Sequence, residues 1–271
     1  MLLSSVIIIL REVLEAALLF SILIALSKQL VFNQQWIGWS AFFGIIGSIV
    51  YAMNIYTVSE WFEGVGQEVS NALMQVCTYF MLVLYLLLLI RFINQQTISK
   101  PVLVFLMIAI SSLAITREGS EIILYFFSVT RSESHFMAVL MGMTIGASIG
   151  ISIGLLFYYL LTNLKPEWSI SLGLFLLILI ASGMVSQSSL LLIQADWLPS
   201  QLPLWDVSGW LPEHSVIGQL LYALIGYEAT PTAIQFGLYF MSIVFPVILL
   251  TVLHIHYKRK NNTQSPDLQE K

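Results

Sequence analysis

The sequence contains little cysteine and little charge, and both shortages exclude classes of protein. Its single cysteine, Cys77, lies within an apolar stretch, so neither an internal disulfide nor a two-cysteine metal motif can form. Charged residues make up 10% of the chain and hydrophobic residues 58%, above the roughly 45–50% of soluble domains. Such a chain cannot cover its apolar surface with polar side chains. It therefore predicts a protein that is solvated by lipid.

Long apolar runs recur along most of the chain, and each is long enough to cross a membrane as a helix. A hydrocarbon layer about 30 Å thick requires about 20 helical residues. The runs are continuous and rich in Leu and Ile, whereas a membrane β-strand alternates apolar and polar residues over about ten positions. We therefore expect an all-α polytopic membrane protein. Its seven predicted transmembrane helices cover 2–27, 37–58, 70–93, 101–128, 135–162, 169–194 and 233–256.

The distribution of basic residues predicts the orientation of these helices. On one side of the membrane, Arg131 is the only basic residue in a predicted loop. The basic residues on the other side include Lys28, Arg91, Lys100, Lys165, Lys258, Arg259 and Lys260. Because cytoplasmic loops carry the excess of Lys and Arg, we expect the N-terminus outside and the C-terminus inside.

The loops predicted to lie outside are acidic, with Glu60, Glu63 and Glu68 after the second span and four further acids before the seventh. An acidic mouth raises the local concentration of cations. The simpler alternative is that outer loops lack Lys and Arg through topology alone. The candidate outer access site consists of Glu63, Glu68, Asp206 and Glu213. Helix capping and solvation are alternative roles for the last two.

Two charged clusters interrupt otherwise apolar spans near their centres. Their residues are Arg11, Glu12 and Glu15 in the first span and Arg117, Glu118 and Glu121 in the fourth. In each cluster the glutamates are three apart and the arginine precedes the second glutamate by four, so all three side chains share a helix face. At about 2.5–3.5 kcal/mol each, six such residues would cost on the order of 15–20 kcal/mol if unpaired. Pairing, hydration or a bound metal must offset this cost.

The two clusters together carry surplus negative charge, four carboxylates against two guanidinium groups. The structural alternative is an Arg–Glu pair that only holds two helices together, but such a pair needs no surplus of negative charge. Hard oxygen ligands suit ferric iron, ferrous iron, manganese, magnesium or calcium and do not separate them. The predicted metal ligands are Glu12, Glu15, Glu118 and Glu121, with Arg11 and Arg117 as supporting partners.

The clusters are three spans apart, so their helices cross the membrane in opposite directions. This parity predicts an inverted repeat, residues 1–95 against 96–195, and such transporters hold their substrate near the midplane between the repeats. The remaining parts are an extracytoplasmic loop over 196–232, a seventh helix over 233–257 and a cytoplasmic tail over 258–271. Within the loop, the apolar piece Ser215–Tyr227 is too short to span and predicts an interfacial or re-entrant helix.

Small and polar residues inside the spans predict helix contacts. Small residues recur every four positions in the second and fifth spans, and in lipid such stripes permit close helix packing. These residues are Ser40, Gly44, Ser48 and Ala52 in the second span and Gly142, Gly146, Gly150 and Gly154 in the fifth. The polar group Ser186–Ser188 in the sixth span either lines the central cavity or makes interhelical hydrogen bonds.

The two clusters, REVLE at 11–15 and REGSE at 117–121, resemble the motifs of the iron permease family of fungal high-affinity iron uptake and its bacterial relatives. Similarity to the bacterial ferrous-iron branch extends to 181–199, 203–208 and 226–231, and the resemblance covers about residues 5–255. The resemblance implies a multi-pass permease of the plasma membrane, the inner membrane in bacteria, that moves ferric or ferrous iron inward. It assigns the metal role to the four cluster glutamates. It also implies a separate iron-oxidising or periplasmic partner protein, iron as substrate and no permanently bound cofactor; no nucleic acid is expected.

Two other functions remain open on the residues alone. The first is a transporter or channel for another divalent cation such as manganese, which metal competition during uptake would separate from an iron permease. The second is an intramembrane enzyme with paired carboxylates, which would form a product without net metal flux. An arginine beside each acid disfavours the enzyme, because it suppresses the proton sharing that carboxylate dyads need.

Overall fold

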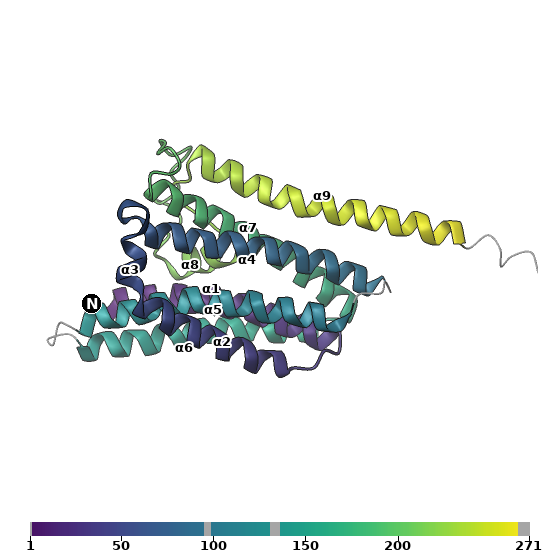
Figure 1. Cartoon of the computed structure of the whole chain (residues 1–271), viewed down its shortest axis with the longest axis horizontal. Helices are drawn as coiled ribbons and strands as arrows, with labels where there is room; N and C mark the ends of the chain where they lie inside the picture. The colour runs from purple at the N-terminus through teal and green to yellow at the C-terminus, as the bar shows by residue number, and fades with distance from the viewer. Residues whose placement is uncertain (1, 95–98, 131–135, 265–271) are drawn as a thin grey trace, which may run out of the picture.

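A computed structural model describes residues 2–94, 99–130 and 136–264, which form long helices joined by loops (Figure 1). In chain order the elements are α1 (Leu2–Gln29), α2 (Gln35–Met53), α3 (Ile55–Ser59), a 3-10 turn (Trp61–Gly64), α4 (Gly66–Ile93), α5 (Lys100–Thr130), α6 (Phe136–Asn163), α7 (Pro166–Gln194), α8 (Val216–Ile225) and α9 (Ala233–Gln264). One isolated antiparallel bridge, between Pro203 and Thr232, closes the loop that contains α8. The expected all-α class is confirmed.

Six of the described helices are long and apolar enough to cross a membrane, namely α2, α4, α5, α6, α7 and α9. Helix α1 has 28 residues, which is sufficient length, but its charged cluster interrupts the apolar run. The crossing of the membrane by α1 and the outward orientation of the N-terminus therefore stay predictions. Figure 1 places the start of α1, the α3 turn and the loop before α9 at the same end of the bundle.

Two helix boundaries differ from the sequence expectation. The second predicted span, 37–58, is divided at Asn54, whose side chain donates to the carbonyl of Val50 at 2.8 Å and competes with the helical pattern. Helix α9 continues to Gln264, so the tail expected from 258 begins as helix. Arg131 and the predicted start of the fifth span at 135 lie outside the described residues.

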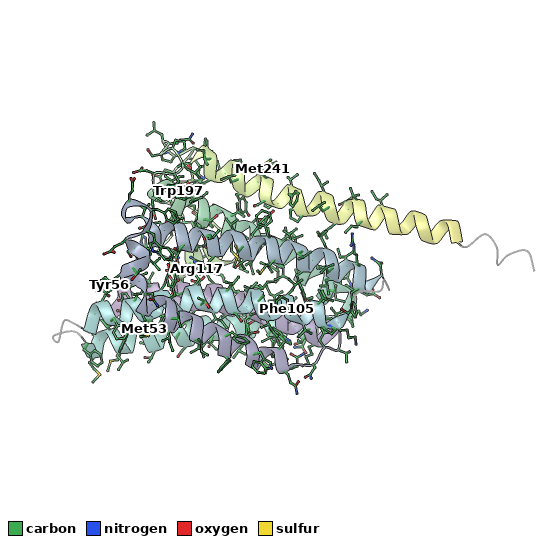
Figure 2. All side chains as sticks on the ribbon, viewed as in Figure 1. Met53, Tyr56, Phe105, Arg117, Trp197 and Met241 are labelled. Atoms are coloured by element: carbon green, nitrogen blue, oxygen red, sulfur yellow. The ribbon has the colours of Figure 1, made fainter. Side chains whose placement is uncertain are left out.

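Large apolar side chains cover the outside of the bundle, as a lipid environment requires. Phe105 and Met241 are each about two-thirds exposed, and Figure 2 shows Met241 on the outer helix α9. Arg117, labelled in the same view, is only 7% exposed and is therefore buried. Large apolar side chains on the outside and a buried, paired arginine inside are what a lipid environment favours.

The long helices pack in three principal pairs. Helix α1 lies along α6, α2 along α5, and α4 along α7. Helix α9 contacts mainly α7 and diverges from the bundle toward its C-terminal end (Figure 1). The helices with the charged clusters, α1 and α5, also contact each other, which brings the two clusters together.

Small residues allow the close approach of α1 to α6 and of α2 to α5. A Cβ atom added at any glycine of the α6 stripe would meet an atom of α1 at 2.6–2.9 Å; the stripe is Gly142, Gly146, Gly150 and Gly154. On α2, a Cβ at Gly44 would lie 2.6 Å from Ile115 of α5, and Ser48 donates to the Ile115 carbonyl at 2.8 Å. The packing role expected of both stripes is confirmed.

Helix α8 is the short apolar helix expected within Ser215–Tyr227. Ser215 caps its first turn by accepting from the Gly218 amide at 3.0 Å, and Gly226 ends it in the left-handed conformation with φ of 63°. Gly226 abuts Gly183 in the middle of α7, where a Cβ would lie 2.8 Å from the Gly226 nitrogen. Because α8 contacts α1 as well as α7, it is inserted among the long helices.

Candidate metal centre

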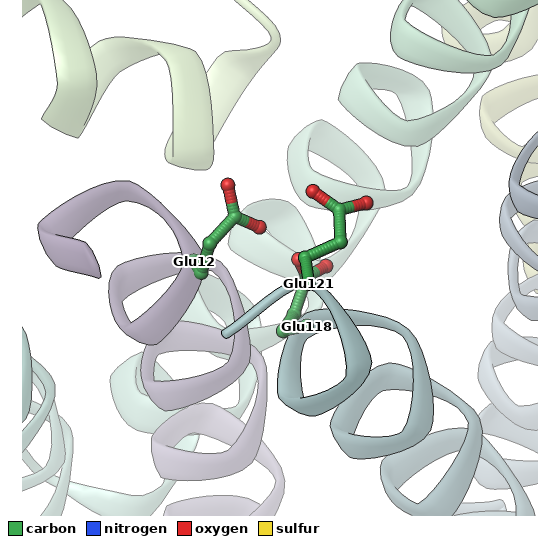
Figure 3. A group of neighbouring side chains, drawn as sticks. All are labelled: Glu12, Glu118 and Glu121. Carbon is green, nitrogen blue, oxygen red and sulfur yellow. The ribbon is translucent and has the colours of Figure 1, made fainter. Parts of the chain in front are cut away.

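Three carboxylates converge where α1 meets α5. The carboxylate oxygens of Glu12, Glu118 and Glu121 lie within 4.8 Å of one another (Figure 3). Glu12 and Glu118 are buried, and Glu121 is half-buried. The three-residue spacing of Glu118 and Glu121 places both on the face of α5 that meets α1. Buried like charges this close are unfavourable unless a proton or a cation compensates them. We refer to these three residues as the carboxylate cluster.

Arg117 is the cation closest to the carboxylate cluster. Its Nη1 atom lies 2.6 Å from Glu118 Oε1 and 3.1 Å from Glu15 Oε2, and its Nε atom lies 3.8 Å from Glu121 Oε1. The pair with Glu121 is the one expected from the spacing of four on a single helix. The pair with Glu15 joins α5 to α1 and was not predictable from either helix alone.

Glu15 lies beside the carboxylate cluster rather than within it. Its Oε2 atom contacts Arg117, and its Oε1 atom lies 3.5 Å from the Nε of Arg11 on the same helix. Glu15 is therefore held by both arginines, whereas Glu12 makes no ion pair with any described residue. The sequence assigns the metal role to all four glutamates, and the structure brings three of them together and places Glu15 in contact with both arginines.

Arg11 contacts α8 and makes no ion pair with the carboxylate cluster among the described residues. Its guanidinium carbon lies 3.8 Å from the ring centroid of Tyr222, and its Nη2 atom donates a hydrogen bond to the Tyr222 hydroxyl. Tyr222 is only 9% exposed. Sequence reasoning missed this residue, because no spacing or motif relates position 222 to the charged clusters.

Neutral polar side chains on α4 and α7 complete the surroundings of the carboxylate cluster. Asn71 donates to Glu121 Oε1 at 3.2 Å. Gln75 donates to Gln187 Oε1 at 2.6 Å, and Arg117 Nη1 donates to the same oxygen at 3.5 Å. Gln187 thus makes interhelical hydrogen bonds, one of the two roles expected for its polar stretch. Asn71 and Gln75 were missed, although two amides four residues apart in an apolar span are a usable signal.

Two buried oxygens of the carboxylate cluster are left without a hydrogen-bond donor. Glu12 Oε2 and Glu118 Oε2 accept no hydrogen bond within the described parts of the chain. A buried polar atom without a partner costs about 1–3 kcal/mol, and more if it is charged. These oxygens are therefore positions at which a proton or a hard cation would be stabilising.

Two cavities of different character reach the carboxylate cluster. A polar cavity of about 320 Å³ is lined by Gln67, Glu68, Asn71, Glu121, Leu124, Leu191 and Gln194. A cavity of about 380 Å³ between α1, α5 and α6 reaches Glu12 and Glu118 and is otherwise lined mainly by apolar residues. Glu68 therefore shares a polar cavity with Glu121, whereas Glu63 is exposed in the 3-10 turn.

The other two residues of the candidate outer access site are engaged with their own loop. Asp206 accepts from the amide of Ser208 at 2.9 Å and from its hydroxyl, and these bonds hold the pKa of the exposed carboxyl below its ordinary value. Glu213 accepts from the Ala229 amide at 2.7 Å. These contacts favour the alternative structural role, in which both carboxylates stabilise the loop around α8.

Comparison with known proteins finds one family that the chain matches. The sequence model of the Iron permease FTR1 family matches residues 2–261, which include both charged clusters and the long helices apart from the last three residues of α9. No curated protein and no solved structure matches the chain. The family match and the arrangement of the carboxylates are therefore the two observations on function.

Proposed function

The chain belongs to the iron permease FTR1 family, and from this premise we propose that it carries iron inward through the carboxylate cluster of Glu12, Glu118 and Glu121. The family match and the six apolar helices identify a multi-pass membrane protein whose transported substrate is iron. Members of the family are permeases, which disfavours the alternative of a carboxylate enzyme. We place the protein in the plasma membrane, the inner membrane if the cell is bacterial.

The convergence of three carboxylates from opposed helices is the observation that carries the proposal. Arg117 is the only cation in ion-pair contact with the cluster within the described residues, so the cluster retains surplus negative charge. Iron in either oxidation state accepts hard oxygen ligands. A dehydrated iron ion between Glu12 and Glu118 would supply the partner that their buried oxygens lack. The role of Glu15 as a further ligand stays a prediction, because both arginines occupy its carboxylate here.

The helix pairing supports an inverted repeat of α1, α2 and α4 against α5, α6 and α7. Exchanging the two sets converts the α1–α6 pair into the α5–α2 pair and leaves the α4–α7 pair unchanged. All three principal helix pairs are thus consistent with the exchange of one repeat for the other. In transporters of this kind, rocking of one repeat against the other opens a central site to each side in turn. We propose this motion for iron translocation.

The polar cavity supports iron access from the end of the bundle that carries the α3 turn. Glu68 and Glu121 line this cavity, and water or hydrated iron is compatible with its polar wall. The cavity on the other side of the cluster is mainly apolar and would not favour an ion in this conformation. We therefore propose that iron reaches Glu121 past Glu68 and that the described conformation faces outward.

Replacing Glu68 by glutamine is expected to raise the KM for iron about threefold to tenfold with little change in Vmax, because the change removes a charge on the access route and not a group of the carboxylate cluster. Radiolabelled iron uptake by cells with equal surface expression measures both constants. The matched control is Glu167→Gln, which removes an exposed carboxylate at the start of α7. A KM equal to that of wild type would contradict the proposed route.

Metal competition tests the choice of iron over other divalent cations. Because carboxylates alone do not separate iron from manganese, the choice depends on the family match. We expect unlabelled iron to reduce the uptake of labelled iron far more than the same excess of manganese does. If manganese is transported as well as iron and iron cannot displace it, the alternative cation transporter is correct.

A separate iron-oxidising or periplasmic protein is the partner that the family resemblance implies. We propose that such a protein delivers iron to the acidic mouth around Glu68. Uptake from ferrous and ferric sources, each with and without an added oxidant or reductant, would identify the oxidation state that the permease accepts.

A further inference from the structure

The two arginines of the charged clusters are used differently, although their positions on α1 and α5 correspond. Each makes the pair expected from a spacing of four, Arg11 with Glu15 at 3.5 Å and Arg117 with Glu121 at 3.8 Å. Arg117 also contacts the glutamate that follows it in sequence, Glu118, at 2.6 Å. Arg11 makes no corresponding contact with Glu12 within the ion-pair distance, so the equivalence of the clusters is broken at this point.

Tyr222 of α8 is a further partner of Arg11, besides Glu15. The ring of Tyr222 lies under the guanidinium of Arg11 at 3.8 Å, and its hydroxyl accepts a hydrogen bond from Nη2. A cation over an aromatic face is attracted to the ring, and the attraction grows as the pair is desolvated; here Tyr222 is buried and the Arg11 side chain is 36% exposed. The two contacts together fix the direction of the Arg11 side chain.

Helix α8 is itself held firmly enough to act as a support. Its N-terminus is capped by Ser215, and its C-terminal Gly226 abuts Gly183 of α7 without room for a Cβ atom. The loop that follows is tied back by the bond from the Ala229 amide to Glu213. Tyr222 is therefore presented to α1 from a fixed element and not from a free loop.

We propose that Tyr222 is a positioning residue that holds Arg11 away from Glu12 and so preserves the negative charge of the carboxylate cluster for an incoming iron ion. The inference rests on the proposed function. Without Tyr222, the long side chain of Arg11 can turn to Glu12, its neighbour in sequence, and compete with the metal for the carboxylate. The cluster would then bind iron more weakly, whereas the movement of bound iron would change little.

Replacing Tyr222 by leucine is expected to raise the KM for iron about tenfold with little change in Vmax, within the 10–100-fold range for residues that support metal ligands. Tyr222→Phe keeps the ring and loses the hydroxyl acceptor, so its KM should lie between those of wild type and Tyr222→Leu. The control is Tyr79→Leu, a buried tyrosine of α4 that donates to the Ser242 carbonyl at 3.1 Å, which is expected to change expression and not KM. Radiolabelled iron uptake, normalised to surface protein, gives both constants.

A double-mutant cycle separates positioning of Arg11 from a general structural role. If Tyr222 acts through Arg11, Tyr222→Leu raises KM in the wild-type background but not in the Arg11→Gln background. Equal KM increases in both backgrounds, or a Tyr222→Leu KM equal to wild type, would overturn the inference. If Tyr222→Leu does not reach the membrane, the same cycle is run with Tyr222→Phe. Absence of saturable iron uptake by wild type would instead overturn the proposed function.

Discussion

Replacing Glu118 by glutamine is expected to reduce iron uptake about 100-fold or more. Removing a group that merely supports a metal ligand already costs about 10–100-fold in affinity, and Glu118 is proposed to be a ligand. Glutamine has nearly the same shape, so the α1–α5 contact is retained. Its amide also brings an N–H group to the buried position where Glu118 Oε2 has no partner. The measurement is radiolabelled iron uptake at an iron concentration well below the wild-type KM.

The control for this substitution is Glu167→Gln, which removes an exposed carboxylate from α7 and is expected to transport iron normally. Surface expression of both variants is measured in the same cells. Uptake by Glu118→Gln within about twofold of wild type would contradict a metal role for the carboxylate cluster. The Arg–Glu contacts would then serve only to hold the helices together.

Replacing Arg117 by glutamine is expected to destabilise the protein as well as to abolish transport. Arg117 is the only cation that contacts carboxylates of both α1 and α5 in the part of the chain that the structure describes. Removing one partner of a buried ion pair typically costs about 3–5 kcal/mol, because the remaining charge is left uncompensated. We expect the detergent-solubilised variant to unfold at a lower temperature than wild type.

Arg117→Lys tests the geometry of this interaction at constant charge. A lysine ammonium is a compact point charge and cannot present the planar fork that reaches Glu15, Glu118 and Glu121 together. We expect stability between those of wild type and Arg117→Gln, with transport still impaired. Arg91→Gln, at an exposed arginine near the end of α4, should leave stability unchanged. Wild-type stability and uptake in Arg117→Gln would be incompatible with this account.

The charged clusters show how much of the site the sequence predicts. The spacing of three and four fixes which side chains share a helix face, and the odd number of spans between the clusters predicts opposed helices. Both inferences depend only on helix geometry, and the carboxylates do converge between α1 and α5. The sequence could not predict the rotation of each helix about its axis. That rotation brings Glu12 to the α5 glutamates and turns Glu15 toward Arg117.

The contribution of α8 lies beyond sequence reasoning for a different reason. A short apolar helix at this position was predictable from its length and composition. Its insertion against α1 depends on tertiary contacts, including the approach of Gly226 to Gly183. The partnership of Tyr222 with Arg11 follows from that insertion and from no local pattern. The division of the second predicted span at Asn54 likewise depends on one side chain that competes with the helix backbone.

Iron binding to the purified protein tests the central claim most directly. Equilibrium binding of radiolabelled iron is measured for wild type and for the triple variant Glu12→Gln, Glu118→Gln, Glu121→Gln, with helical content compared by circular dichroism. The account predicts saturable binding by wild type and its loss in a triple variant that remains helical. Unchanged affinity in the triple variant would place the iron site elsewhere and contradict the claim.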